Sequence, residues 1–280
     1  TYGDWSSDVC SSDLTIAHTS DELPPVGAAV QALAACTPAR LMVGRVGPAY
    51  RTRTWLTLRS DHAAARDAVE AEVHVERDLN SLVDRFSLFE VQSQATSKPE
   101  YLAHPDRGRH LSESSLARIR KECSSGADLQ VVIGDGLSAA AIAAQVPVVF
   151  PHLAAEATAR GWRIGRPFFV RHCRVGVLND IGEALDPAVI VLLIGERPGL
   201  AAADSLSAYL AYRPRAGHTD AQRNLISNIH SRGVAPIAAA SRVVALAEVM
   251  MQVKTSGFTV KEPPTLHPGQ LWDKNRDILS

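Results

Sequence analysis

Two short apolar runs in the second half of the chain constrain its fold more than any other feature. Residues 129–133 (LQVVI) and 189–194 (VIVLLI) are rich in branched side chains and lack the alternation of a strand with one solvated face. Such runs are typical of strands buried on both faces of a parallel sheet. Stretches at residues 153–160 and 168–177 are helix-like and strand-like, respectively. The sequence therefore predicts an α/β fold with a Rossmann-like, mostly parallel open sheet.

Helix-forming patterns lie on either side of this region. Residues 61–73 (DHAAARDAVEAEV) are mostly strong helix formers, and Asp61 is suited to cap the first turn. Residues 236–254 have the pattern of a long amphipathic helix that covers one face of the sheet, with Gly257 as its stop signal. Residues 92–100 are polar and contain proline, which favours a linker.

These patterns divide the chain into four parts. Residues 15–95 predict a small helical N-terminal domain, residues 96–260 the Rossmann-like domain, and residues 261–280 an irregular tail with three prolines. Residues 1–14 (TYGDWSSDVCSSDL) have no periodicity, and their back-translation resembles a common sequencing-library adapter. We expect this first segment to be a sequencing artefact without ordered structure, and it is excluded from the fold prediction.

Charge and cysteine usage exclude several classes of protein. The 29 basic and 30 acidic residues give a net charge of −1, or +2 without residues 1–14, which predicts neither a nucleic-acid nor an anionic-membrane partner. The longest apolar run, residues 188–194, is shorter than the roughly 20 residues that span a bilayer. The four cysteines have no C-x-x-C or metal-ligand spacing, which favours a reducing compartment and predicts no metal site. The sequence motifs of zinc hydrolases, serine hydrolases and nucleoside triphosphatases are also missing.

A glycine-rich turn follows the first buried run. Residues 134–139 (GDGLSA) fit the pattern G-x-G-x-x-A, with which dinucleotide-binding folds bring a pyrophosphate to a helix N-terminus. Ribose binding in such folds also requires an acidic residue about 20 positions further on, at the end of a strand, and none occurs here. A tight strand-to-helix turn is the simpler interpretation. An NAD(P)-dependent oxidoreductase that uses the turn at Gly134 and Gly136 remains the alternative.

Two further clusters follow apolar segments. Glu196, in the sequence G-E-R-P-G, comes directly after residues 189–194, at a position where carboxylates contact ligands in open α/β sheets. The same residues could instead form a turn closed by a Glu–Arg pair. Residues 227–230 (SNIH) could supply hydrogen bonds to a polar ligand or cap a turn, and both interpretations stay open.

Seven short motifs occur in an order that resembles one known family. They are residues 44–48 (GRVGP), 61–67 (DHAAARD), 105–109 (PDRGR), 131–138 (VVIGDGLS), 166–171 (RPFFVR), 195–200 (GERPGL) and 226–230 (ISNIH). Together they resemble the small, or light, subunit of ethanolamine ammonia-lyase. The resemblance extends from about residue 40 to residue 257.

This resemblance implies an enzyme subunit that is not active alone. The family's enzyme is a hetero-oligomer that uses adenosylcobalamin to convert ethanolamine to acetaldehyde and ammonia by radical chemistry, in ethanolamine catabolism. A large barrel subunit carries out catalysis, and the small subunit helps to close the cobalamin site at the interface. The resemblance also implies that the cofactor carries the cobalt, that this chain has no catalytic residue, and that the complex resides in an ethanolamine-type bacterial microcompartment or in the cytoplasm.

The family's cobalamin contacts match three positions of this chain. They are Val175, which follows Arg174, Glu196 in the G-E-R-P-G turn, and Leu225 just before the I-S-N motif. The family usually has cysteine at the position of Leu225, so this contact would be made by the backbone or by packing on the corrin. Asp135 and Ser138 are further candidates, because they follow a predicted strand. A non-catalytic scaffold is the third functional hypothesis, after the lyase subunit and the oxidoreductase.

Overall fold

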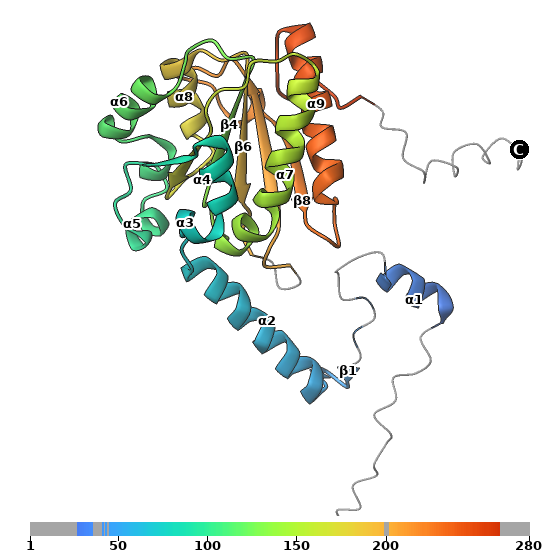
Figure 1. Cartoon of the computed structure of the whole chain (residues 1–280). Coiled ribbons are helices and arrows are strands. Elements are labelled where there is room, and N and C mark those ends of the chain that lie inside the picture. The colour runs from blue at the N-terminus through green and yellow to red at the C-terminus, as the bar shows by residue number, and fades with distance from the viewer. Residues whose placement is uncertain (1–26, 36–40, 42, 44, 199–201, 264–280) are drawn as a thin grey trace, which may run out of the picture.

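A six-stranded sheet forms the centre of the computed structural model, which describes residues 27–35, 41, 43, 45–198 and 202–263 (Figure 1). The strands lie in the order β3-β5-β4-β6-β7-β8. Their bounds are β3 (Phe89–Gln92), β4 (Leu129–Gly134), β5 (Phe168–Arg171), β6 (Val189–Gly195), β7 (Leu206–Tyr212) and β8 (Asn224–Ile229). The pairs β3–β5, β4–β5 and β4–β6 are parallel, whereas β7 is antiparallel to both β6 and β8. The predicted α/β fold with a mostly parallel sheet is confirmed.

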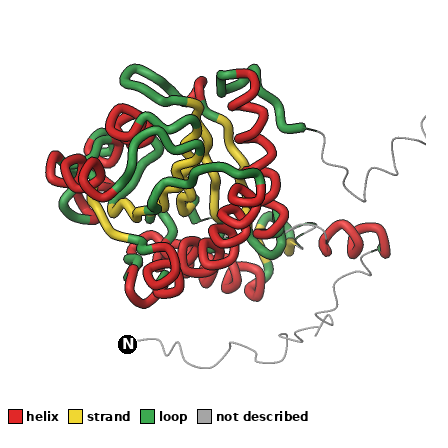
Figure 2. The backbone as a smooth tube through the Cα atoms, turned by 45° about the horizontal axis from the view of Figure 1, so that its top comes forward, coloured by secondary structure: helices red, strands yellow, loops and turns green. Residues whose placement is uncertain are grey.

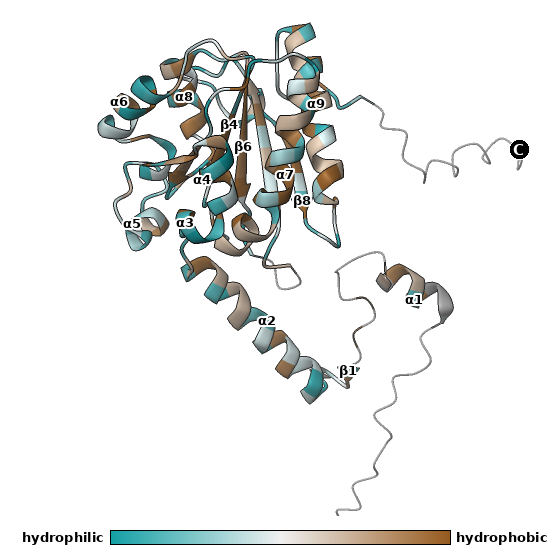
Figure 3. Ribbon diagram, viewed as in Figure 1, coloured by the Kyte–Doolittle hydropathy of each residue, from teal (hydrophilic) through white to brown (hydrophobic). Residues whose placement is uncertain are grey.

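Strands β4 and β6 are the two apolar runs that the sequence indicated. Every residue of both strands is buried, because they lie in the middle of the sheet and helices cover its two faces. Hydrophobic residues accordingly concentrate on these strands (Figure 3). In β6, Val191 and Leu193 belong to the core on one face, and Ile190 and Leu192 to the core on the other. Burial on both faces explains why neither run alternates with polar residues.

Helices lie on both sides of the sheet (Figure 2). On one face, α7 (Ala139–Ala159) and α9 (Pro236–Val253) pack against each other, and on the other lie α6 (Glu113–Glu122) and α8 (Val177–Leu185). By length and composition α7 and α9 could cross a membrane, a test that core helices also pass, and here both bury apolar side chains against the sheet. The remaining elements are α1 (Ala28–Ala35), β1 (Arg45–Val46), β2 (Ala49–Tyr50), α2 (Thr52–Glu70), α3 (Val75–Asp78), α4 (Asn80–Phe86), α5 (Lys98–Ala103), η1 (Arg107–Arg109) and η2 (Asp220–Gln222).

Strand β3 lies inside the range 15–95 that the sequence assigned to a helical domain. It pairs with β5, and Leu79 and Leu82, from the segment of α3 and α4, belong to the core shared with the sheet. The sheet domain therefore extends N-terminally of the predicted boundary at residue 96. A four-residue edge strand is too short to produce a clear periodicity. Residues 92–100 are not a linker, since they contain the end of β3 and the start of α5, which Ser97 caps by accepting from the backbone N–H of Glu100.

Two helix predictions change their boundaries. Helix α2 begins at Thr52, so Asp61 lies within the helix and not at its cap, because neither glycine nor proline interrupts residues 52–60. Residues 153–160 are not a separate helix but belong mostly to α7, which continues through Pro147 and Pro151.

Two predicted ends also differ from the structure. Strand β5 ends at Arg171 because His172 has a φ of 56°, outside the β region. Helix α9 has its predicted length, but its C-cap residue is Lys254, in the left-handed conformation, and Gly257 does not end the helix. Residues 1–14 and most of the predicted tail 261–280 lie outside the described residues.

Candidate functional site

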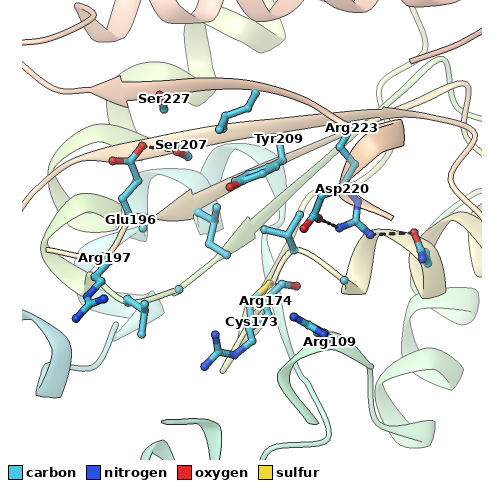
Figure 4. Close-up of a pocket in the computed structure, with 18 of the residues that line it drawn as sticks. Arg109, Cys173, Arg174, Glu196, Arg197, Ser207, Tyr209, Asp220, Arg223 and Ser227 are labelled. Atoms are coloured by element: carbon cyan, nitrogen blue, oxygen red, sulfur yellow. Dashed lines mark hydrogen bonds and ion pairs between the residues drawn. The ribbon is translucent and has the colours of Figure 1, made fainter. Parts of the chain in front are cut away.

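A cavity of about 720 Å³ opens at the carboxyl ends of β4, β5 and β6 (Figure 4). The chain leaves β4 for α7 on one face of the sheet and leaves β5 for α8 on the other, so the loops after these neighbouring strands separate. Ligands in open α/β sheets bind at such a point. One wall continues along β7 and β8, where Ser207, Tyr209, Leu225 and Ser227 line the cavity.

The cavity brings together the three residues that the family resemblance indicated. Val175 lies between β5 and α8, Glu196 follows β6, and Leu225 lies on β8. Val175 packs against the core beneath α8, whereas the side chain of Leu225 is 45% exposed at the cavity wall. The sequence separates Val175 from Leu225 by 50 residues, so their meeting depends on the order of the strands.

Hydrogen bonds fix the carboxylate of Glu196. Its Oε2 accepts from the hydroxyl of Ser205 at 2.7 Å, and its Oε1 accepts from the hydroxyl of Ser207 and, at 3.0 Å, from the backbone N–H of Asn228. Both serines come from β7 or the residue before it. No arginine or lysine pairs with this carboxylate among the described residues, so the alternative interpretation, a turn closed by a Glu–Arg pair, does not apply to them.

Asp135 lies beside the cavity but points into the protein. Its Oδ1 accepts from the backbone N–H groups of Gly136 and Cys173, and its Oδ2 accepts from that of His172, at 2.7–2.8 Å. Burial raises the pKa of Asp135, and the N–H donors of Cys173 and His172 oppose this rise. Asp135 therefore joins the ends of β4 and β5, and its oxygens are engaged within the chain.

Ser138 is likewise used within the fold. It caps α7 by accepting from the backbone N–H of Ala141 at 3.1 Å, and its hydroxyl donates to the carbonyl of Ala203 at 2.5 Å. Its side chain is fully buried, so the chain covers the first turn of α7.

The glycines of the G-x-G-x-x-A pattern serve internal packing. A Cβ on Gly134 would lie 2.6 Å from Sγ of Cys173, and a Cβ on Gly136 would lie 2.2 Å from the carbonyl oxygen of Gly195. Gly136 also has a φ of +59°. The turn is a tight strand-to-helix connection, as the simpler interpretation proposed. With the N-terminus of α7 capped and covered, the geometry does not favour a pyrophosphate there.

Arginine side chains supply the positive charge of the cavity. Arg109, Arg174, Arg197 and Arg223 line it, against the carboxylates of Glu196 and Asp220. Asp220 pairs with Arg223 at 2.5 Å, as Figure 4 shows.

Sequence reasoning missed strand β7 and therefore Ser207 and Tyr209. The signal was present, because residues 206–212 (LSAYLAY) alternate between the core beneath α9 and the cavity side. For residues 227–230 the sequence left two interpretations open, and the structure supports a different one for each end of the segment. Ser227 lines the cavity, whereas His230 is buried and hydrogen-bonds Asn228 at 2.7 Å.

The fold and the cavity define an α/β protein with a candidate ligand site at the carboxyl edge of a mostly parallel sheet. The chain belongs to the family of ethanolamine ammonia-lyase light chains, whose family model matches residues 28–261. This match includes the whole sheet and every residue that lines the cavity.

Curated relatives of the same description cover most of the chain. The ethanolamine ammonia-lyase small subunit of Clostridium acetobutylicum is 39% identical over 229 residues, which are 82% of this chain and 93% of that protein. The small subunit of Clostridioides difficile is 37% identical over 259 residues, 91% of this chain and 87% of that protein. That of Listeria monocytogenes is 41% identical over 225 residues, 80% of this chain and 75% of that protein.

Proposed function

We propose that this chain forms one wall of an adenosylcobalamin site, at its interface with the large subunit of ethanolamine ammonia-lyase. The complex would convert ethanolamine to acetaldehyde and ammonia. The observation that carries the proposal is that Val175, Glu196 and Leu225, matched to the family's cobalamin contacts one by one, line the same open cavity.

The chemistry of the cavity fits a corrin ring with amide side chains. A carboxylate has about four lone-pair positions, and Glu196 uses three of them within the chain. The fourth can accept an N–H from a corrin amide. Because Ser205 and Ser207 already hold the carboxylate, little side-chain entropy is lost when the ligand binds. Val175 and Leu225 offer apolar surface in the same cavity, and Leu225 replaces the usual cysteine by packing.

The shape of the cavity favours a shared site. A corrinoid with its nucleotide tail is much larger than the drug-sized ligands that pockets of about 300–1,000 Å³ enclose. This cavity is open, and Leu225 at its wall is 45% exposed. A second protein chain would have to cover the rest of the ligand. In the family's enzyme that second chain is the large subunit.

Within such a complex, this chain would position the cofactor. When bound, adenosylcobalamin supplies the radical chemistry, and protein supplies binding, orientation and exclusion of water. Glu196 would fix the corrin through one amide, and Leu225 and Val175 would exclude water from its edge. Among the described cavity residues, Asp220 is paired with Arg223, and Glu196 and the other arginines carry the charge that is suited to binding.

Reconstitution tests this proposal. We expect ammonia release from ethanolamine only when this chain, the large subunit and adenosylcobalamin are all present. Release by the large subunit and cofactor alone, at an equal rate, would contradict the proposal. Reduction of NAD(P) by this chain alone would instead support the oxidoreductase alternative.

A further inference from the structure

Two arginines lie at the N-terminus of helix α8, away from Glu196. Arg109 and Arg174 both line the cavity, and Figure 4 shows them on the side opposite Ser227. Gly176, the N-cap residue of α8, lies against Arg109, since a Cβ on Gly176 would lie 2.6 Å from Cβ of Arg109. Arg174 precedes Gly176 by two residues, and its backbone N–H donates to the carbonyl of Gly108 at 2.8 Å. The two side chains therefore start from adjacent segments.

Neither guanidinium is neutralised by a carboxylate within the part of the chain that the structure describes. The guanidinium of Arg109 has no ion pair or hydrogen bond with any residue that the structure describes, although its backbone N–H donates to the carbonyl of Asp106. Arg174 stacks on Tyr101 at 4.6 Å and donates from Nη2 to the carbonyl of Tyr101 at 3.1 Å, while its buried Nε has no partner. The stacking holds Arg174 in place without removing its charge. A buried donor without a partner indicates that an acceptor is missing.

The other charged groups nearby are already paired. Arg223 contacts Asp220 and Asn179, and His110 lies 3.3 Å from Asp180, whose other oxygen accepts the backbone N–H of Leu111. The buried Nε of Arg223 has no partner either, but its guanidinium is already paired with Asp220. Among the described residues, Arg109 and Arg174 are thus the guanidinium groups at this end that no carboxylate neutralises.

The N-terminus of α8 adds to the positive potential. Gly176 provides no side-chain cap, unlike Ser138 at the start of α7. The backbone N–H groups of Val177 and Leu178 donate to the carbonyls of Arg174 and Val175, so the start of α8 contributes no free N–H donor. It does place the positive end of the helix dipole at the cavity beside the two arginines, which favours a negatively charged group.

We propose that Arg109 and Arg174 bind the phosphodiester of the nucleotide tail of cobalamin, an inference that rests on the proposed function. The phosphodiester is the anionic group of this cofactor, whose other side chains are neutral amides. Guanidinium groups are suited to it, because their planar N–H donors match phosphate oxygens. Glu196 would then hold the corrin periphery, and the two arginines the tail, at opposite ends of one cavity.

Corrinoids with and without the tail provide the test. In the reconstituted complex, we would measure the Kd of hydroxocobalamin and of cobinamide, which lacks the nucleotide tail, by equilibrium dialysis. We expect Arg109→Gln and Arg174→Gln each to weaken hydroxocobalamin binding about tenfold, as expected for a lost charge-assisted hydrogen bond. Cobinamide binding should change less than twofold in both variants. Arg120→Gln, which removes an exposed charge from α6, is the matched control and should change neither Kd.

Each other outcome counts against this subsite in a different way. Equal weakening for both corrinoids would mean that the arginines do not recognise the tail, and unchanged Kd values would mean that they do not contact the cofactor. Weaker subunit association at unchanged cofactor affinity would mean that the two arginines contact the large subunit and not the cofactor. If the unsubstituted complex bound neither corrinoid, the proposed function itself would fail. Arg109→Lys and Arg174→Lys keep the charge and should recover part of the hydroxocobalamin affinity.

Discussion

The backbone N–H of Cys173 donates a 2.7 Å hydrogen bond to Oδ1 of Asp135. This bond joins the first residue after β4 to the second residue after β5, and the sequence separates these two strands by more than 30 residues. His172 precedes Cys173 in the left-handed conformation and donates to the other oxygen of Asp135. The loop that carries Val175 to the cavity is therefore held by a carboxylate that does not line the cavity.

We expect Asp135→Asn to destabilise the protein by about 2–3 kcal/mol. Three backbone N–H groups point at the two carboxylate oxygens, and asparagine offers one oxygen and one amino group. At least one N–H would face another donor. Urea unfolding measures the change, and Asp84→Asn, at an exposed position on α4, should stay within about 0.5 kcal/mol. Equal stability of the two variants would show that Asp135 does not hold the loop.

Ser207→Ala tests whether the orientation of Glu196 matters for binding. The variant removes one hydrogen bond and leaves those from Ser205 and from the backbone of Asn228. We expect cobalamin to bind the reconstituted complex about 3- to 10-fold more weakly, since a hydrogen bond contributes roughly 1 kcal/mol. Ser81→Ala, on the exposed side of α4, is the matched control. An unchanged Kd for Ser207→Ala would indicate that the orientation of the Glu196 carboxylate does not contribute to cobalamin binding.

Leu225 offers a test of apolar contact with the corrin. Because Leu225 is 45% exposed on strand β8, Leu225→Asp should destabilise the protein by only about 1 kcal/mol. In the complex it should weaken cobalamin binding tenfold or more, by placing a charge where apolar surface is buried. Leu225→Cys, which introduces the residue usual in the family, should stay within threefold. The account of this contact is wrong if the aspartate variant binds cobalamin normally.

Stability should fall at alkaline pH partly because of one buried thiol. Burial raises the pKa of Cys123 to about 11, against a lowering by Arg166, and Glu122 adds to the rise. In the unfolded chain the pKa of this thiol is about 8.5. Its contribution to the free energy of unfolding is therefore complete below that pH, and it is lost as the pH rises toward the pKa of the folded state. The loss reaches up to about 1.4 kcal/mol per pH unit. The free energy of unfolding, measured with urea, should decline less steeply with pH for Cys123→Ala than for the unsubstituted protein. Parallel pH curves for the two proteins would disprove the raised pKa of Cys123.

The central strands were predictable because their side chains carry a strong signal. Residues 129–133 and 189–194 became β4 and β6, and the helix predicted from Pro236 became α9. The edge strand β3 was missed, since four residues beside helical segments give no clear period. Residues 206–212 alternate but contain alanine, serine and tyrosine, a mixture that does not distinguish a strand by composition.

The candidate site was predictable only in part. Glu196 was indicated by its place after a buried strand, and Val175 and Leu225 by the family resemblance. The partners of Glu196, Ser205 and Ser207, depend on the antiparallel pairing of β6 with β7, which no local pattern indicates. Asp135 was a candidate because of its position at a strand end. Its side-chain direction follows from the left-handed His172 across the sheet, and a sequence pattern does not reveal such a contact.

The affinity of cobalamin for the complex with Glu196→Ala tests the central claim most directly. Equilibrium dialysis would compare the large subunit alone, the large subunit with this chain, and the large subunit with the variant. We predict tight binding only with the unsubstituted chain, and a Kd at least tenfold higher for the variant at unchanged subunit association, as expected for loss of a charged hydrogen-bond acceptor. Equal affinity in all three samples would contradict the assignment of this cavity to the cofactor.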